Sequence, residues 1–316
     1  MFDLILPFPF IVIKYVQHSS STNQPQELAI SRVLRCGQAF RWKFVDDIWS
    51  CTIQNRVLLL KQDETFLHFA SIPHMKDTEE VVMDYFNLQI KLEDLYLDWA
   101  SKDKHFTKNS MNFGGIRMLR QDPWENLVSF ICSTNNNVKR ISKMCENLCI
   151  HYGDFLVDHQ GIKHYLFPEP ARLAGPNVET ELRELGFGYR AKYIQQTAQM
   201  LTDKDEFLKL YTMRTEPHKA CHEYLQSFKG VGPKVADCVC LMSLDKHDVV
   251  PVDTHVFKIA TKDYRMPGKV LNKELYAQIQ DKFKELWGEY AGWAHSVLFA
   301  ADLRDLNNGI NIKTEK

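Results

Sequence analysis

The pattern of apolar and polar positions divides the chain into two parts of different character. Between about residues 28 and 72, apolar stretches of strand length lie between polar turns, at residues 38–44, 48–53, 56–62 and 66–70. Residues 78–89 then show the apolar spacing of a helix, with Thr78 as its expected cap. The pattern predicts a mainly antiparallel sheet with one helix, an N-terminal α+β module over residues 27–105.

From residue 106 to residue 308 the apolar positions follow helical spacing. Asp122, Pro123 and Glu125 supply a cap, a first-position proline and an acidic third residue, which together predict a helix start. Later helical stretches cover residues 217–228, 233–245, 253–264, 272–287 and 290–299. We therefore predict an α+β fold, with an antiparallel sheet module followed by a mostly α-helical domain in which residues 106–308 are all helical. We assign no structure to residues 1–26, and residues 309–316 read as a polar tail.

The last helical stretch, residues 290–299, is apolar almost all round and should be buried. On this pattern alone Trp293, His295 and Phe299 are core residues. A buried imidazole is usually hydrogen-bonded, so we expect a neighbouring group to satisfy His295.

Two short amphipathic helices are expected to meet at Gly230, Val231 and Gly232, and Pro233 suits the first position of the second helix. Glycines allow positive φ and the close approach of another backbone, so the amides of this turn can face a phosphate oxygen. Residues 217–245 thus form a predicted helix-hairpin-helix. Such a motif binds the nucleic-acid backbone without reading sequence.

Two candidate reactive groups follow this turn. Lys234 lies in the first turn of the second helix, where the positive end of the helix dipole disfavours an ammonium and a lysine can serve as a nucleophile. Asp253 is placed to cap the helix that begins at Thr254, and capping amides stabilise its carboxylate. Taken singly, each group also fits an ordinary surface charge or helix cap. The combination is far more specific.

Charge and cysteine content limit the function classes. The 39 basic and 40 acidic residues give a formal net charge of −1, so any nucleic-acid surface must be local. Lys139, Arg140, Lys143, Arg190 and Lys192 can supply a local basic patch, although a solvated basic face is the commoner fate of such charges. The eight cysteines have no regular spacing, which favours reduced thiols over a disulfide framework. The apolar stretch at residues 1–16 is too short and interrupted to span a membrane.

From about Ser31 to Arg304 the chain resembles the eukaryotic 8-oxoguanine DNA glycosylase/lyases, which belong to the helix-hairpin-helix glycosylases with a Gly/Pro-rich loop and a catalytic aspartate. Six segments carry the resemblance in the expected order: CGQAFRW, RQDPWENLVSFICSTNNN, LGFGYRAKY, GVGPKVADCVCLM, VPVDTH and YAGWAHSVLFAADLR. Some related endonucleases carry a four-cysteine iron–sulfur loop near the C-terminus. This chain has no cysteine after Cys240, so we expect no such cluster.

The resemblance implies a role for each matching residue. It makes Lys234 the nucleophile and Asp253 the catalytic carboxylate. For the extruded base it implies a carbonyl contact from Gly37, a sandwich between Cys238 and Phe299, and a position for His295 at the base edge. For the duplex it makes Tyr189 the wedge. It implies contacts to the orphaned cytosine from Asn135, Arg140 and Arg190. His255, with the hairpin residues Gly230 and Gly232, would contact phosphate. Considered without the resemblance, Gly37 is better explained as a turn residue.

One position departs from the family pattern, which usually has glutamine where this chain has His295. A neutral imidazole offers one donor and one acceptor, but it has a shorter reach than glutamine. We therefore expect 8-oxoguanine activity with altered base selectivity. A thiolate–ammonium pair between Cys238 and Lys234 is also implied, one helical turn apart.

Taken together, these features predict a bifunctional glycosylase and abasic-site lyase that acts as a monomer on duplex DNA containing 8-oxoguanine. We expect no metal, no cofactor and no membrane partner, and the sequence identifies no downstream repair protein. The expected location is the nucleus, with the mitochondrion as an alternative. Two other functions stay open: a monofunctional glycosylase for other damaged bases, which would not need Lys234, and a non-catalytic DNA-binding module.

Overall fold

The computed structural model describes residues 10–14, 27–110 and 113–303. Most of the unassigned N-terminal segment and the whole polar tail therefore lie outside the described residues. The strands are β1 (Ile11–Lys14), β2 (Lys43–Val45), β3 (Ile48–Ile53), β4 (Arg56–Gln62), β5 (Phe66–Ile72), β6 (Phe155–His159) and β7 (Ile162–Tyr165). The α-helices are α1 (Ile30–Val33), α2 (Thr78–Tyr85), α3 (Leu92–Lys102), α4 (Lys104–Ser110), α5 (Pro123–Ser133), α6 (Val138–Tyr152), α7 (Pro170–Leu173), α8 (Val178–Glu184), α9 (Arg190–Met200), α10 (Lys204–Thr212), α11 (His218–Leu225), α12 (Pro233–Ser243), α13 (Thr254–Lys262), α14 (Lys273–Trp287) and α15 (Ala291–Asp302). Two 3₁₀ turns are η1 (Met213–Thr215) and η2 (Gly288–Tyr290).

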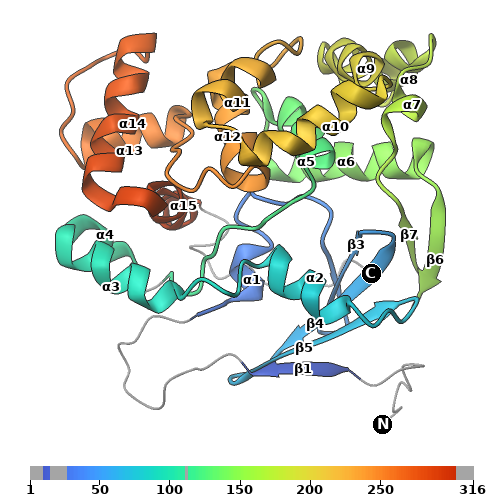
Figure 1. The fold of residues 1–316 in the computed structure, drawn as a ribbon, viewed down its shortest axis with the longest axis horizontal. Helices are drawn as coiled ribbons and strands as arrows, with labels where there is room; N and C mark the ends of the chain where they lie inside the picture. Colours follow the sequence, from blue (N-terminus) through green and yellow to red (C-terminus); the bar gives the residue numbers. More distant parts are fainter. Residues whose placement is uncertain (1–9, 15–26, 111–112, 304–316) are drawn as a thin grey trace.

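An antiparallel five-stranded sheet in the order β1-β5-β4-β3-β2 forms one end of the molecule (Figure 1). The predicted strands at 48–53 and 56–62 are confirmed as β3 and β4. Gln54 and Asn55 between them adopt the positive φ values that a tight hairpin requires. Helices α1 and α2 pack on one face of the sheet, and residues of β6 pack on the other. The sheet is therefore covered on both faces. Strand β1 lies within residues 1–26, to which we assigned no structure.

The strand expected at residues 38–44 is wrong over most of its length, because only Lys43–Val45 pair. The preceding side chains bind the helical part of the molecule instead. The Gln38 amide donates to the Arg117 carbonyl and accepts from the Leu119 amide, both at 2.9 Å. Arg41 pairs with Glu125 at the start of α5. These contacts hold residues 36–42 against the helices.

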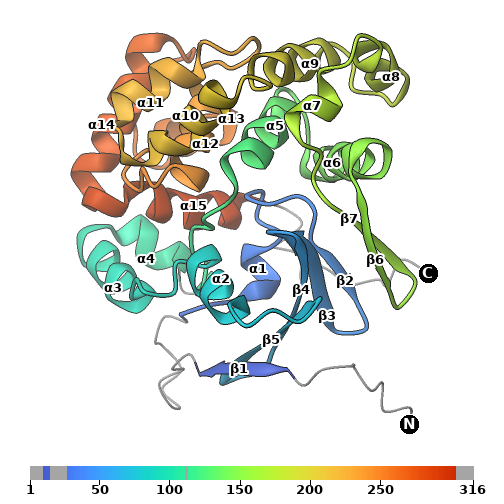
Figure 2. The same cartoon turned by 45° about the vertical axis from the view of Figure 1, so that its right-hand side comes forward.

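The helices form the other end of the molecule around α15 (Figures 1 and 2). Burial of α15 is confirmed: Trp293 is fully buried, and Phe299 is partly buried against the same core. Helices α5 and α12 pack against each other. The expectation that residues 106–308 are all helical is wrong at the β6–β7 hairpin, which extends beside the sheet in Figure 2.

Helices α3 and α4 join the helical core rather than the sheet. Trp99 and Phe106 pack edge to face, and Phe106 also contacts Trp287 of α14. The predicted domain limit near residue 105 falls in this packing, and the domain limits stay a prediction. Among the described residues, no helix is long and apolar enough to cross a membrane.

Candidate active site

The predicted hairpin is present as helix α11, a turn and helix α12. Gly230 in the turn has φ of +82°, and an added Cβ there would lie 2.3 Å from the Tyr193 ring. Gly232 has φ of −94° and is the N-cap of α12, and an added Cβ would meet open space. Gly230 is thus required by the turn, whereas Gly232 leaves an uncovered helix start that another backbone can approach. Pro233 occupies the first helical position as expected.

Lys234 points from the start of α12 toward α5. Its Nζ donates to Ser133 Oγ at 3.3 Å and lies 5.2 Å from the centre of the Phe130 ring. Cys238, one turn later, is buried, and its burial raises the pKa of the thiol to about 11 against the opposing effect of Lys234. The thiol is therefore neutral near pH 7. The charge of Lys234 and its hydrogen bond to the thiol favour the thiolate but do not offset burial in the free protein, and the thiolate–ammonium pair stays a prediction.

Asp253 is the N-cap of α13, as predicted. Its Oδ1 accepts from the amides of His255 at 2.8 Å and Val256 at 2.9 Å. Among the described residues Oδ2 has no hydrogen-bond partner. The cap therefore fixes the carboxylate and leaves one oxygen for a ligand.

These groups line a small cavity of about 60 Å³, which we call the Lys234 pocket. Its lining comprises Cys36, Gly37, Gln38, Phe130, Lys234, Cys238, Met242, Pro251, Asp253, Val256, His295, Ser296 and Phe299. All six residues to which the sequence assigned catalysis or base contact therefore meet at one place. The cavity has room for only a few water molecules, so a purine can enter only after side chains move.

Gly37 and Phe299 close the pocket on one side. Gly37 has φ of +85°, and an added Cβ would lie 3.5 Å from the Phe299 ring. The positive φ agrees with the prediction that Gly37 is a turn residue. Its position in the pocket agrees with the prediction that its carbonyl contacts the base. The turn brings its own backbone to the cavity wall.

His295 is 6% exposed, and neither ring nitrogen has a hydrogen-bond partner among the described residues. The Gly292 carbonyl lies close to the ring without forming a well-aligned hydrogen bond, so the expectation of a fully satisfied core histidine is not met. Burial lowers the pKa of His295 to about 4, although the Asp253 carboxylate and the nearby Gly292 carbonyl oppose this change. The imidazole is thus neutral at pH 7, with one donor and one acceptor unused at the pocket wall.

Four of the residues expected to contact the duplex lie at the α5–α6 and α8–α9 connections or in the first turn of the helix that follows each: Asn135, Arg140, Tyr189 and Arg190. Arg190 is buried and donates to the carbonyls of Thr134 and Asn135, so it holds that loop and adds no charge to the surface. Tyr189 is half-exposed beside it, and Arg140 is exposed and donates to the Gly186 carbonyl. The expected basic patch therefore lacks one of its members.

His255, expected at a phosphate, pairs with Asp302 at 2.8 Å in the structure. Its ring also meets Phe299 edge-on, with 5.7 Å between the ring centres. His255 therefore touches the side chain that helps to close the Lys234 pocket.

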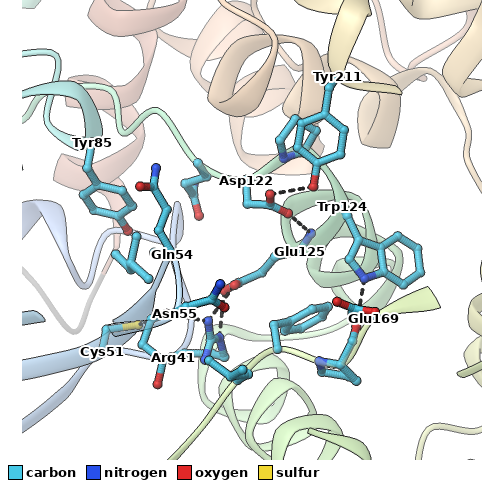
Figure 3. A pocket seen from close by; sticks show the side chains of 18 of the residues that line it. Arg41, Cys51, Gln54, Asn55, Tyr85, Asp122, Trp124, Glu125, Glu169 and Tyr211 are labelled. Atoms are coloured by element: carbon cyan, nitrogen blue, oxygen red, sulfur yellow. Dashed lines mark hydrogen bonds and ion pairs between the residues drawn. The ribbon is translucent and has the colours of Figure 1, made fainter. Parts of the chain in front are cut away.

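A larger cavity of about 540 Å³ lies between the sheet and the helices (Figure 3). The acidic groups at its centre already have partners: Glu125 accepts from Arg41, and Asp122 accepts from the Glu125 amide and from Tyr211. Neither Lys234 nor Asp253 lines it. Because the candidate nucleophile and carboxylate line the smaller Lys234 pocket, that pocket is the candidate active site despite its smaller volume.

The sequence analysis did not identify several residues that contact the site residues. Phe130 and Ser133 lie on the face of α5 that meets Lys234, and their three-residue spacing in a recognised helix was the available signal. Tyr193 against Gly230 and Asp302 against His255 had no such signal, because both depend on tertiary packing. Among the described residues, no three His, Cys, Asp or Glu side chains gather as metal ligands.

Comparison with known proteins places this geometry in context. Residues 21–127 match the family model "8-oxoguanine DNA glycosylase, N-terminal domain", and residues 128–289 match "HhH-GPD superfamily base excision DNA repair protein". The chain is 37% identical to an N-glycosylase/DNA lyase of Saccharomyces cerevisiae, covering 88% of this chain and 84% of that one. It is 40% identical to the Arabidopsis thaliana N-glycosylase/DNA lyase OGG1, covering 88% and 78%. A solved Clostridium acetobutylicum 8-oxoguanine glycosylase/lyase, bound to duplex DNA with cytosine opposite 8-oxoguanine, superimposes with a TM-score of 0.80 at 29% identity, covering 92% of this chain and 94% of that one.

Proposed function

The chain belongs to the 8-oxoguanine DNA glycosylase family of the HhH-GPD superfamily, and on that premise we propose that it excises 8-oxoguanine opposite cytosine from duplex DNA and then cleaves the abasic strand. One observation carries the proposal: Lys234 and Asp253 meet in a single buried pocket directly behind the hairpin turn. A nucleophilic lysine at that place is what a combined glycosylase and lyase needs.

The reaction starts with extrusion of the damaged nucleotide, because a stacked base shields its sugar C1′. Lys234 Nζ attacks C1′, and the base leaves with the electrons of the glycosidic bond. The sugar passes through an oxocarbenium-like state, which the Asp253 carboxylate stabilises once the extruded nucleotide fills the small pocket and displaces its water. The amine at C1′ loses its protons as the C1′–O4′ bond opens, which gives a protonated O4′ and a Schiff base between Nζ and C1′. Loss of a proton from C2′ then expels the 3′-phosphate by β-elimination, which cleaves the strand on the 3′ side. Ser133 and the Phe130 face hold the Lys234 side chain toward the pocket beforehand.

Base recognition falls to the remaining pocket residues. The Gly37 carbonyl accepts from the N7–H that 8-oxoguanine has and guanine lacks. Cys238, as a neutral thiol, and Phe299 stack on the two faces of the base. His295 supplies the unused donor and acceptor to the base edge. An acceptor left unpaired when guanine enters costs about 1–3 kcal/mol, which is part of the selectivity.

Contacts outside the pocket hold the distorted duplex. The amides at Gly230 and Gly232 bind phosphate at the start of α12. Tyr189 enters the gap left by the extruded base, and Asn135 lies on the same surface, held by the buried Arg190. Arg140 faces the orphaned cytosine and His255 a backbone phosphate. The His255–Asp302 pair must then open.

Borohydride trapping tests the proposal directly. Native protein and Lys234→Gln are incubated with duplexes carrying 8-oxoguanine opposite cytosine, 8-oxoguanine opposite adenine, guanine opposite cytosine, or an abasic site. We expect a covalent adduct on the 8-oxoguanine:cytosine and abasic duplexes, and its loss in the variant, because reduction traps only a Schiff base.

Two other results would exclude the proposal. Base release without an adduct would indicate a monofunctional glycosylase that does not use Lys234. Tight duplex binding with neither product nor adduct would indicate a DNA-binding module. Melting curves of both proteins show whether Lys234→Gln is folded.

A further inference from the structure

Asp237 is a fully buried aspartate on α12, three residues after Lys234, and its side chain is 1% exposed. A buried carboxylate is costly unless donors surround it. We propose that Asp237 is a positioning residue: it fixes the nucleophile Lys234 and the carboxylate of Asp253 relative to each other, through helices α11 and α14. The inference rests on the proposed function and names a residue that the reaction scheme above does not use.

The donors to Asp237 come from two other helices. From α14, Tyr276 donates its hydroxyl at 2.6 Å and Gln280 its amide at 2.8 Å, both to Oδ2. From α11, His218 Nε2 lies 3.0 Å from Oδ1, and His222 Nε2 lies 3.5 Å from the same oxygen. A carboxylate oxygen accepts, so the His218 contact is a hydrogen bond in the ring form that carries a proton on Nε2. Asp237 thus joins the helix of Lys234 to both α11 and α14.

The same two α14 side chains also bind the segment that leads to Asp253. Gln280 donates from its amide nitrogen to the Val250 carbonyl at 3.0 Å. The Tyr276 hydroxyl accepts from the Val252 amide at 3.3 Å. Residues 250–252 directly precede Asp253. Two short paths, through Tyr276 and through Gln280, therefore run from α12 to the catalytic carboxylate.

This arrangement is more than helix packing, because both reactive groups depend on it. Lys234 stands at the free end of α12, and Asp253 stands at the start of α13 after a segment without strand or helix. Displacement of a reacting group by about 1 Å can lower a rate by about 100-fold. The network around Asp237 restrains the backbone on both sides of the pocket.

Two variants separate position from charge. Asp237→Asn keeps the shape of the side chain but removes its charge and places an amide against donors. Tyr276→Phe leaves the charge of Asp237 unchanged and removes the hydroxyl that joins it to the Val252 amide. Tyr264→Phe is the matched control, because the Tyr264 hydroxyl donates to Asp103 at the same distance, 2.6 Å, in the same helical core.

The measurement is the single-turnover rate constant on 8-oxoguanine:cytosine duplex with protein in saturating excess, together with duplex affinity and thermal melting. We expect the rate constant to fall about 10- to 100-fold in Asp237→Asn and several-fold in Tyr276→Phe, with duplex affinity within about threefold of native. Tyr264→Phe should lose thermal stability and keep the native rate constant.

Each other outcome overturns the inference. Lower melting temperatures with native rate constants would assign Asp237 a purely structural role. Slowing in Asp237→Asn but not in Tyr276→Phe would mean that charge, not position, matters. If native protein itself neither excises the base nor forms an adduct, the proposed function fails. If native protein is active and both variants keep its rate constant, only the positioning role of Asp237 fails.

Discussion

His295 gives the sharpest test of how the pocket is built, because its ring is buried and no described residue forms a well-aligned hydrogen bond with either ring nitrogen. Replacing it by leucine removes the buried polar ring and places an apolar side chain in the core. The Gly292 carbonyl beside the ring offsets part of the cost of burial, which leaves one unsatisfied group at about 1–3 kcal/mol, so His295→Leu should be more stable than native protein by about that amount at pH 7.5. The same change removes the donor and acceptor offered to the base, so excision should slow by about 10-fold or more, as expected from a loss of about 1.4 kcal/mol or more in the transition state.

The pH dependence sharpens this prediction. The pKa of His295 falls from 6.5 to about 4 on folding, so between these values the unfolded chain binds a proton that the folded chain does not. Native stability is therefore intact above pH 6.5 and is lost as pH falls toward 4. At pH 5 the loss amounts to about 2 kcal/mol from the difference in proton binding. The advantage of His295→Leu should thus widen by about 2 kcal/mol between pH 7.5 and pH 5.

Urea unfolding of both proteins at the two pH values measures the difference, and other titrating groups cancel because both proteins contain them. His164→Leu is the control: His164 is also buried on β7, its Nε2 is also unpartnered, and burial lowers its pKa to about 4 as well. The stability of His164→Leu relative to native protein should increase by a similar amount between pH 7.5 and pH 5, and its excision rate should equal that of native protein. A variant less stable than native protein at pH 7.5, or a stability gap that does not change with pH, would show that the imidazole is not buried in neutral, unpaired form.

Two further predictions concern the hairpin and the carboxylate. Gly230→Ala should weaken duplex binding about 10-fold or more, because φ of +82° costs a residue with Cβ about 1–2 kcal/mol and the new methyl meets Tyr193; fluorescence anisotropy checks this, and native affinity would contradict the phosphate role of the turn. Asp253→Asn keeps the cap oxygen but loses the charge, so the single-turnover rate should fall about 100- to 1,000-fold with unchanged duplex affinity, and a rate near native would exclude electrostatic stabilisation by Asp253.

Local sequence rules predicted the elements that local chemistry determines. Strands β3 and β4 follow from alternating apolar stretches around a polar turn, and the start of α5 follows from its cap, proline and acid. Residues 38–42 could not be predicted in this way, because the Gln38 and Arg41 side chains bind groups about 80 residues away in the chain. Tertiary contacts outweighed strand propensity there.

The assembly of the pocket shows the same limit. The hairpin turn, Lys234 and Asp253 are close in sequence, so chemistry alone could suggest a site. Gly37 and Phe299 lie about 200 residues before and 65 residues after Lys234, and only the family resemblance connected them to it. Their meeting in the structure depends on Gln38 binding the segment after residue 116, which carries Gly37 to the helical core.

Asp237 and His295 show what periodicity leaves undetermined. Both are ionisable groups on apolar helices, and spacing predicts the burial of each. Their partners differ: Asp237 has donors from two helices, whereas His295 has none among the described residues. The number of partners depends on which helices pack alongside, and no local pattern encodes that. The difference is also functional, because a satisfied buried charge holds structure in place, while an unsatisfied polar group at a cavity wall gains its hydrogen bonds only when a ligand enters. Substitutions at His295 that stabilise the free protein should therefore slow excision, whereas substitutions at Asp237 should lower both the stability and the excision rate.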